Sequence, residues 1–367
     1  MRPASALILA LVCLSCLSAS RCSNPLSPSG GDSITIVAYN VKSLFDAVDN
    51  GPEFPEFSVA RGRWDDARYR MRLANAAAAV LAAVPRGAGL PGPDLLCLEE
   101  IENEGVLEAL RSGPLSAARY RYAAVAPAEG GPFSDCVLSR LPIVSTRCHA
   151  ATTPGGRVGR DLLEVELEAK GGRLVLLSCH WKSKSGGGEE TEEARREEAA
   201  LVRGRAAALL SAGPGAALVV CGDFNESPDE YLRVDRRYAT ALMPVEEVHR
   251  GAAPSAGGSL PLRRLLVAST PALALPLEGE VVLFSPWAAS AGYSYSYSYR
   301  GSRERLDGFL LSPGLLGEGG LRFKAFAVAA APFLLDAKGD PLAWPGSGAS
   351  GYSDHLPVLL ELEARPQ

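Results

Sequence analysis

The chain has 367 residues, of which 47% are hydrophobic and 22% are charged, and this balance excludes a disordered protein. The length permits one large domain or two smaller ones. The formal net charge is −5, from 37 Lys and Arg against 42 Asp and Glu residues. An acidic chain has no long-range attraction to polyanions, so binding of nucleic acid would need a local basic patch or a bound metal ion.

Residues 1–22 have the pattern of an export signal. Arg2 is followed by an apolar run over residues 6–17 and then by small residues. The run is too short to span a bilayer. Cys16 and Cys22 allow lipid attachment as in bacterial lipoproteins, and ordinary cleavage after the small residues is the alternative. We therefore expect a signal peptide or lipoprotein leader, and a protein that is secreted, periplasmic or anchored by lipid to the bacterial cell envelope.

The next segment, residues 23–32, is rich in Ser, Pro and Gly and predicts a linker. We expect the folded domain to cover residues 33–367. Eight short apolar runs in it predict strands, most of them apolar on both alternating faces and therefore covered on both sides. These runs lie at residues 34–40, 94–100, 135–144, 162–168, 173–180, 217–225, 305–312 and 356–363.

Two segments between the strands predict helices. Residues 65–84 begin with two Asp residues suited to a helix start, and residues 189–210 are rich in Glu early and in Arg later, which suits the helix dipole. Residues 250–292 are poor in charge and rich in Ala, Pro, Gly and Leu, so we expect a long irregular insertion. Many strands and few helices predict two sheets packed face to face with helices outside.

The alternation of Tyr and Ser over residues 293–299 would place four tyrosines on one face of a strand. Two interpretations are open. The face belongs to an amphipathic strand covered with tyrosine, or it is a stacking surface for bases or lipid. Periodicity alone does not separate them.

Polar side chains follow several of the predicted strands, at the point where each strand ends. They are Asn40, Glu99, Glu100, His180, Asp223 and Asn225. A buried strand that delivers a carboxylate, amide or imidazole at its carboxyl end is a common way to build a site. Two further motifs precede strands near the C-terminus, Arg305-Leu306-Asp307 and Ser353-Asp354-His355.

This set contains carboxylates, amides and imidazoles but no nucleophilic Ser or Cys in an elbow-like context. Hard oxygen ligands suit Mg²⁺, Mn²⁺ or Ca²⁺. A metal ion that shares its ligands with a phosphate neutralises developing charge, and a His oriented by an Asp serves as general acid or base. Together the residues predict attack of water on a phosphate ester.

The order of these motifs resembles the deoxyribonuclease-I-like endonuclease/exonuclease/phosphatase superfamily, and especially its bacterial exported nuclease-type members. The motifs that carry the resemblance are Asn40, Leu98-Glu99-Glu100, His180-Trp181-Lys182-Ser183, Gly222-Asp223-Phe224-Asn225, Arg305-Leu306-Asp307 and Ser353-Asp354-His355. The resemblance covers nearly all of residues 33–364. It implies an α/β fold, a four-layer α/β/β/α sandwich of two mixed β-sheets flanked by helices, with the site at one end of the sheets.

The resemblance also implies the metal ligands and the groups that bind substrate. Glu100 would be the main metal ligand, with Asn40 and Asp354 as further ligands. The cofactor would be Mg²⁺, with Mn²⁺ or Ca²⁺ possible. Asn40 and Lys182 would contact the substrate phosphate, and Arg160 is a further candidate because Arg suits oxyanions, although it could equally be an ordinary residue at a strand end.

The catalytic residues that the resemblance implies are His180, Asp223, Asn225, Asp307 and His355. Asp223 would orient or deprotonate the attacking water, and Asn225 would hold a phosphoryl oxygen. His355 would contact the scissile phosphate, as general base or as transition-state donor, with Asp307 fixing its tautomer. His180 would act near the leaving group or stabilise the pentavalent phosphate.

Three positions depart from the family pattern, and one of them is Gly308, which follows Asp307 where a bulkier residue is often found. Glu99 stands where family members often carry Gln, and we expect it to point away from the site because neighbours in a strand face opposite sides. Lys42 stands where some relatives have an acidic or amide residue, which would weaken a second metal position.

These observations predict an exported, Mg²⁺-dependent endonuclease acting on DNA, with RNA as a possible substrate. The alternative is a sphingomyelinase-type lipid phosphodiesterase or an inositol-phosphate phosphatase, for which the Ala- and Leu-rich insertion and the tyrosines could dock on a membrane. A binding module with a dead site is disfavoured, because every catalytic position expected from the family is filled. The sequence gives evidence of nucleic acid or phosphorylated lipid as partners and none of a protein partner.

Overall fold

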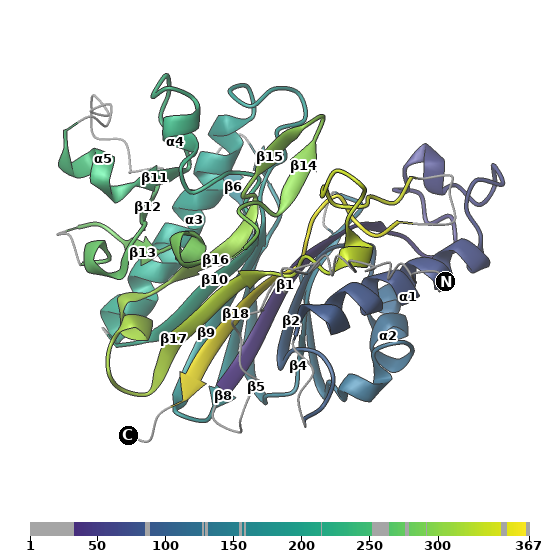
Figure 1. Cartoon of the computed structure of the whole chain (residues 1–367), viewed down its shortest axis with the longest axis horizontal. Coiled ribbons are helices and arrows are strands. Elements are labelled where there is room, and N and C mark those ends of the chain that lie inside the picture. The colour runs from purple at the N-terminus through teal and green to yellow at the C-terminus, as the bar shows by residue number, and fades with distance from the viewer. Residues whose placement is uncertain are drawn as a thin grey trace, which may run out of the picture.

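Two β-sheets lie face to face in the computed structural model, and helices cover their outer faces (Figure 1). The expected signal peptide, residues 1–22, and the expected linker, residues 23–32, lie outside the described part of the chain. The structure describes residues 33–84, 89–126, 128, 131–153, 156–157, 159–213, 215–251, 264–275, 279–290, 292–345 and 351–364.

The first sheet is mixed and has six strands. Strand β1 pairs in parallel with β2 and antiparallel with β18. In spatial order the strands are β17 (Leu321–Val328), β18 (Val358–Ala364), β1 (Ser33–Leu44), β2 (Leu95–Ile101), β4 (Ser134–Ser139) and β3 (Tyr122–Ala126).

The second sheet is also mixed and has eight strands. Strand β10 pairs in parallel with β9 and antiparallel with β16. In spatial order the strands are β11 (Leu242–Pro244), β12 (Leu265–Ala268), β13 (Val282–Phe284), β16 (Asp307–Leu311), β10 (Ala217–Asp223), β9 (Gly172–His180), β8 (Leu162–Ala169) and β5 (Ile143–His149). Two short hairpins stand apart, β14 (Tyr297–Tyr299) with β15 (Ser302–Glu304) and β6 (Thr152–Thr153) with β7 (Gly156–Arg157).

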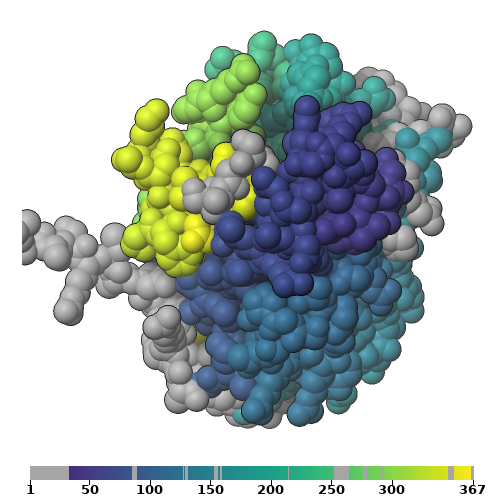
Figure 2. Space-filling model, turned by 90° about the vertical axis from the view of Figure 1, so that its right-hand side faces the viewer, coloured from purple at the N-terminus to yellow at the C-terminus, as the bar shows by residue number. Residues whose placement is uncertain are grey.

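Helices α1 (Asp66–Ala83) and α2 (Glu104–Ser112) cover the first sheet, and Figure 2 shows this outer face in blue. Helix α3 (Glu192–Ala212) covers the second sheet, which also carries the short helices α4 (Glu230–Arg233) and α5 (Val245–His249) (Figure 1). Short 3₁₀-helices lie at Pro55–Phe57, Ser116–Ala118, Pro271–Leu273, Pro286–Ala289, Pro313–Leu316 and Pro332–Leu334. Among the described helices, none combines the length and apolar character needed to cross a bilayer.

Both predicted helices are present. Helix α1 begins where predicted, because the Asp65 side chain accepts a hydrogen bond from the Arg68 amide nitrogen at 2.8 Å and caps the helix. Helix α3 begins at Glu192, three residues after the predicted start.

One apolar core fills the space between the sheets and extends to the helices α1 and α2, and a second one lies between the second sheet and α3. Cys97 of β2 and Cys221 of β10 meet in the first core, with their Sγ atoms 3.4 Å apart. Val202 of α3 belongs to the second core together with Leu177 of β9 and Leu218 of β10. The layers are therefore helix, sheet, sheet and helix, and the predicted fold is confirmed.

Three local predictions are wrong. The run at residues 135–144 is not one strand, because it divides at Pro142, which has no amide hydrogen to donate, into β4 of one sheet and β5 of the other. The segment at residues 250–292 is not wholly irregular, since β12 and β13 lie within the second sheet and were too short to show a period.

The tyrosine alternation is the third. Only Tyr297–Tyr299 belong to a strand. Tyr295 is buried and packs against Tyr293, whereas Tyr299 is exposed, so the four rings do not share one face.

Gly222 of β10 provides a test of how closely the strands at the site pack. Its φ is +129°, and a Cβ atom there would lie 1.9 Å from the carbonyl oxygen of Cys179 on β9. We predict that Gly222→Ala lowers the free energy of unfolding by about 3 kcal/mol or more. Urea denaturation measures this, with Gly204→Ala in α3 as the control, since a Cβ atom there meets no atom within 4 Å and should stabilise by up to ~1 kcal/mol. Similar effects of the two substitutions would contradict the prediction.

Candidate active site

The polar residues that follow the strands meet at one edge of the two sheets. Asn40 stands on β1 next to β2, and the register places His180 of β9 beside Asp223 of β10 and Asp223 beside Asp307 of β16. Because β1 and β2 are parallel, as are β9 and β10, their carboxyl ends lie at the same edge. The predicted convergence of these residues is therefore present.

Bulges in β1 and β2 aim the Glu100 side chain into the site. Lys42, Ser43 and Glu100 have φ values of +56°, +54° and +63°, and the pairing register shifts at these positions. Such left-handed conformations of residues other than Gly cost energy and concentrate at functional sites. The Glu100 carboxylate accepts hydrogen bonds from the Ser43 amide nitrogen at 2.7 Å and from Ser43 Oγ at 3.1 Å.

The Asn40 side chain joins the two sheets. Its Nδ2 donates to Glu100 Oε1 at 3.2 Å and to Asp223 Oδ2 at 3.0 Å. Ser353 Oγ donates to the Asn40 carbonyl oxygen at 2.7 Å and so ties the Ser353-Asp354-His355 motif to β1. Asn225 is fixed beside Asp223, because the backbone nitrogen of Asn225 donates a hydrogen bond to Asp223 Oδ1 at 2.8 Å.

His355 forms a buried pair with Asp307. Its Nδ1 lies 2.8 and 3.0 Å from the two Asp307 carboxylate oxygens, so Nδ1 carries a proton and Nε2 faces the site. Nε2 is 3.9 Å from Asp223 Oδ2 and 4.0 Å from Asp354 Oδ1. Burial disfavours the charged imidazole, but the nearby carboxylates, Asp307 first, outweigh it and raise the pKa of His355 to about 10.

His180 lies on the other side of Asp223 in a different environment. Its Nε2 is 3.7 Å from Asp223 Oδ2 and 3.9 Å from Glu100 Oε1. Burial, followed by the positive charge of Arg160, holds the pKa of His180 well below its usual value. The two imidazoles therefore differ, with His355 charged and His180 neutral at pH 7.

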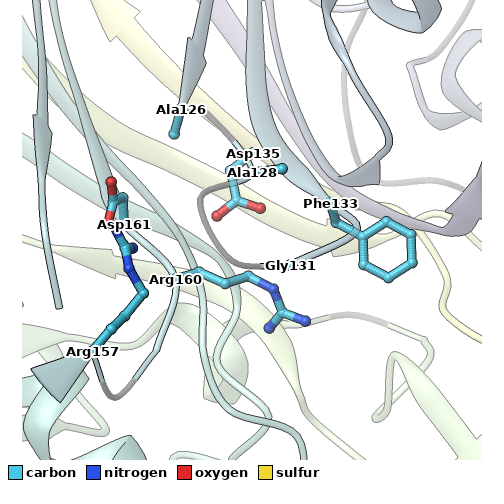
Figure 3. A pocket seen from close by; sticks show the side chains of 8 residues that line it. All are labelled: Ala126, Ala128, Gly131, Phe133, Asp135, Arg157, Arg160 and Asp161. Atoms are coloured by element: carbon cyan, nitrogen blue, oxygen red, sulfur yellow. The ribbon is translucent and has the colours of Figure 1, made fainter. Parts of the chain in front are cut away.

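Asp135 of β4 is a site neighbour that the sequence did not reveal. Its Oδ1 lies 3.8 Å from His180 Nδ1, and neither of its oxygens has a hydrogen-bond partner among the described residues. Burial raises its pKa to about 7. Asp135 lines a side pocket of about 30 Å³. Figure 3 shows the Arg160 guanidinium in this pocket directed toward Phe133 and away from Asp161.

A cavity of about 450 Å³ opens over these groups, within the size range of small-molecule sites. Seven predicted residues line it: Glu100, Arg160, His180, Asp223, Asn225, Asp354 and His355. Asn40 and Asp307 are buried against members of this group through the hydrogen bonds described above. Lys182 is not among the lining residues, and its backbone nitrogen donates to Glu198 Oε2 at 2.7 Å.

The remaining lining residues include aromatic side chains, of which the sequence singled out only Tyr297, as part of the alternation of Tyr and Ser. The Tyr297 ring packs on the His355 ring, with centroids 4.6 Å apart. Phe54, Phe57, Phe133 and Trp344 also line the cavity. They come from three distant segments of the chain, so no local pattern signals the group. Glu99 does not line the cavity, and burial between the sheets raises its pKa well above the usual value.

The donor atoms of the site fit a hard divalent cation. Burial, opposed by His355 and reinforced by Asp307, raises the pKa of Asp223 to about 7, so a cation nearby would stabilise its carboxylate. Glu100 and Asn40 offer oxygen ligands of the kind that Mg²⁺ prefers. Asp354 is already ion-paired with Lys42 and would join only if the ammonium moved aside.

Asp223, Asp307 and His355 form a second cluster, whose ligand atoms lie within 4.8 Å of one another. The hydrogen bonds between His355 Nδ1 and Asp307 already occupy two members of this cluster. The oxygens around Glu100 are therefore candidate ligands for a cation, and the His355–Asp307 pair is suited to proton transfer.

A family model described as Endonuclease/Exonuclease/phosphatase family matches residues 35–237. The chain belongs to this family of hydrolases, which confirms the resemblance inferred from the motifs. A search of curated proteins found no match.

Solved structures share the fold. Truncated TDP2 from Caenorhabditis elegans matches with a TM-score of 0.52 and 14% identity, covering 90% of this chain and 98% of that one. An endonuclease/exonuclease/phosphatase family protein from Bacteroides thetaiotaomicron matches at 0.51 and 15%, covering 93% and 100%. Sphingomyelinase C from Streptomyces griseocarneus matches at 0.50 and 16%, covering 91% and 99%. At these identities the likeness shows the fold alone.

The buried carboxyl group of Asp135 makes the stability of the folded protein depend on pH. Its pKa rises from 3.8 to about 7 on folding, so the folded state binds more protons between these pH values and wild-type stability falls as the pH rises through them. We predict that Asp135→Asn matches the wild type near pH 4 and is more stable at pH 8 by an amount on the order of 3 kcal/mol.

Thermal unfolding in EDTA at the two pH values measures this difference. The control is Asp66→Asn, which removes an exposed carboxylate of α1 and should change little at either pH. The same stability difference for Asp135→Asn at both pH values would show that the folded protein does not shift the titration of this group.

Proposed function

We propose that the protein is an exported, divalent-metal-dependent phosphodiesterase that acts as an endonuclease on DNA, with RNA as a further substrate. The observation that carries the proposal is the convergence of two sets of groups on one cavity. One set is the carboxylate–amide chain of Glu100, Asn40 and Asp223, and the other is the His355–Asp307 pair. Export rests on the pattern of residues 1–22, and detection of the protein outside the cytoplasm after cell fractionation tests it.

Glu100 and Asn40, with Asp354 as a third candidate, would hold the metal ion, Mg²⁺ first and Mn²⁺ or Ca²⁺ as alternatives. A divalent ion bound there would neutralise negative charge on the substrate phosphate and favour its attack by water. Lys42 and Arg160 are the Lys and Arg residues that line the cavity, and they add positive charge for the phosphodiester.

The protein groups account for the proton movements of a one-step hydrolysis. Asp223, as a carboxylate, accepts the proton of the water whose oxygen forms the new bond to phosphorus. His355 is charged and donates a hydrogen bond from Nε2 to a phosphate oxygen, while Asp307 holds its ring and tautomer. The ester bond to the leaving oxygen breaks in the same step, and the proton taken by Asp223 passes to that oxygen through neutral His180, whose Nε2 lies 3.7 Å from Asp223 Oδ2. No covalent intermediate is required, and burst kinetics would contradict this sequence.

Lipid phosphodiester hydrolysis of the sphingomyelinase type is a second candidate, together with hydrolysis of inositol phosphates. One observation favours a lipid. Val48 and Phe54 are 58% and 38% exposed on the segment between β1 and α1, and Phe54 lines the cavity, so apolar side chains stand close to the site.

Nicking of supercoiled plasmid by the purified protein tests the function. We predict Mg²⁺-dependent nicking that EDTA abolishes, and a fall in kcat of about a hundredfold or more in Glu100→Gln, Asp223→Asn and His355→Ala. The control is Glu108→Gln, which changes an exposed carboxylate on α2 and should leave the rate unchanged.

Nicking that persists in EDTA would contradict metal dependence. A folded wild-type protein that leaves DNA intact would contradict the nuclease proposal. Hydrolysis of sphingomyelin or inositol phosphates with the same dependence on the three residues would then support the second candidate.

A further inference from the structure

We infer that the aromatic side of the cavity is a subsite for one unpaired nucleobase, which stacks on Phe54 and donates an amino hydrogen bond to Glu56. This inference rests on the proposed nuclease function. The subsite consists of Phe54, Glu56, Phe57, Phe133 and Trp344, all of which line the same cavity as the catalytic groups. A substrate bound at the catalytic end of the cavity therefore lies beside these aromatic side chains.

The Phe54 ring is held in place before any substrate arrives. It makes edge-to-face contacts with Phe45 and Phe133, at centroid distances of 5.7 and 5.6 Å. The segment that carries it is also braced, since Asp49 accepts hydrogen bonds from the amide nitrogens of Val59 and Ala60 at 2.7 and 2.8 Å. The ring nevertheless remains 38% exposed. A fixed, exposed aromatic ring provides a stacking surface at little cost in conformational entropy.

The acidic side chains on the segment of Phe54 favour an uncharged base at this ring, whereas Lys42 and Arg160, which line the same cavity, supply positive charge for the phosphate. Between Leu44 and Arg61 the chain carries Asp46, Asp49, Glu53 and Glu56 and no Lys or Arg. This local negative charge repels the sugar–phosphate backbone. An exposed carboxylate such as Glu56 accepts hydrogen bonds from the exocyclic amino groups of cytosine, adenine or guanine. The subsite therefore suits the uncharged part of a nucleotide.

The same surface fits a lipid tail poorly. The other large apolar side chains that are exposed in the described residues, apart from Val48, lie on separate elements, such as Leu90, Val144, Leu232 and Leu275. None of these four lines the cavity with Phe54, so the cavity offers an acyl chain no further apolar side chain from this exposed group. A base within a duplex also fits poorly, because its faces are covered by stacked neighbours and its amino group is paired. An unpaired base is the occupant that meets both requirements.

The test compares three oligonucleotides in steady-state cleavage by the full chain with Mg²⁺. One is single-stranded, one is the same strand in a duplex, and one is the single strand with an abasic residue beside the scissile phosphate. Wild-type protein is expected to cleave the complete single strand with a KM about tenfold below that of the other two. Phe54→Ala should raise the KM of the complete single strand about tenfold, with kcat within twofold, and should leave the abasic strand unaffected.

Two further variants separate stacking from packing. Phe54→Trp keeps an aromatic face and should retain the low KM, and Glu56→Gln should change the preference among bases at the position beside the scissile phosphate. The matched control is Phe333→Ala, which truncates a phenylalanine of similar exposure, 42%, that does not line the cavity. It should leave all three KM values unchanged.

Each outcome bears on one of the two proposals. If Phe54→Ala slows cleavage of the complete and abasic strands equally, the ring only supports the fold and the subsite is overturned. If wild-type protein cleaves all three oligonucleotides with one KM, the subsite fails and the nuclease function stands. If it cleaves none, the proposed function itself fails, and loss of sphingomyelin hydrolysis in the Phe54 and Glu56 variants would reassign the surface to a choline headgroup.

Discussion

The Asn40 amide bridges two carboxylates from two different sheets, and the rest of the site depends on this bridge. Its Nδ2 lies 3.2 Å from Glu100 and 3.0 Å from Asp223. A single amide nitrogen thereby fixes the spacing between the residue assigned to the cation and the residue assigned to the attacking water. Because both carboxylates stand at the ends of buried strands, the apolar packing between the sheets sets the geometry of the chemistry.

The same frame produces opposite electrostatic behaviour in two imidazoles that flank Asp223. His355 contacts Asp307 directly, so a nearby negative charge compensates its burial and the ring remains protonated. His180 is also buried, but its ring nitrogens lie 3.7 Å from Asp223 and 3.8 Å from Asp135, beyond hydrogen-bond distance, and the positive charge of Arg160 is close, so the neutral ring is favoured. One histidine is thus suited to hold an anionic phosphate and the other to act without adding charge.

Much of this arrangement could be predicted from the sequence, because parallel buried strands bring their carboxyl ends to one edge and the motifs stand at those ends. The bulges in β1 and β2 could not be predicted from the sequence. Lys42, Ser43 and Glu100 adopt positive φ values there, and none of them is a glycine, the residue that usually indicates this conformation. The aromatic subsite and Asp135 were also missed, because tertiary folding alone brings their segments to the site. For Lys182 the sequence predicted a contact with the substrate, but the structure does not place this residue among those that line the cavity.

Binding of Mg²⁺ to the purified protein tests the central claim, that the carboxylates around Asn40 form a cation site. A ligand that binds only the folded state raises the melting temperature as its concentration increases. We predict such a rise for the wild type and for the surface variant Glu108→Gln, and none for Glu100→Gln, which keeps the shape of the side chain and removes its charge. An equal rise in Glu100→Gln, or no rise in the wild type, would contradict the account.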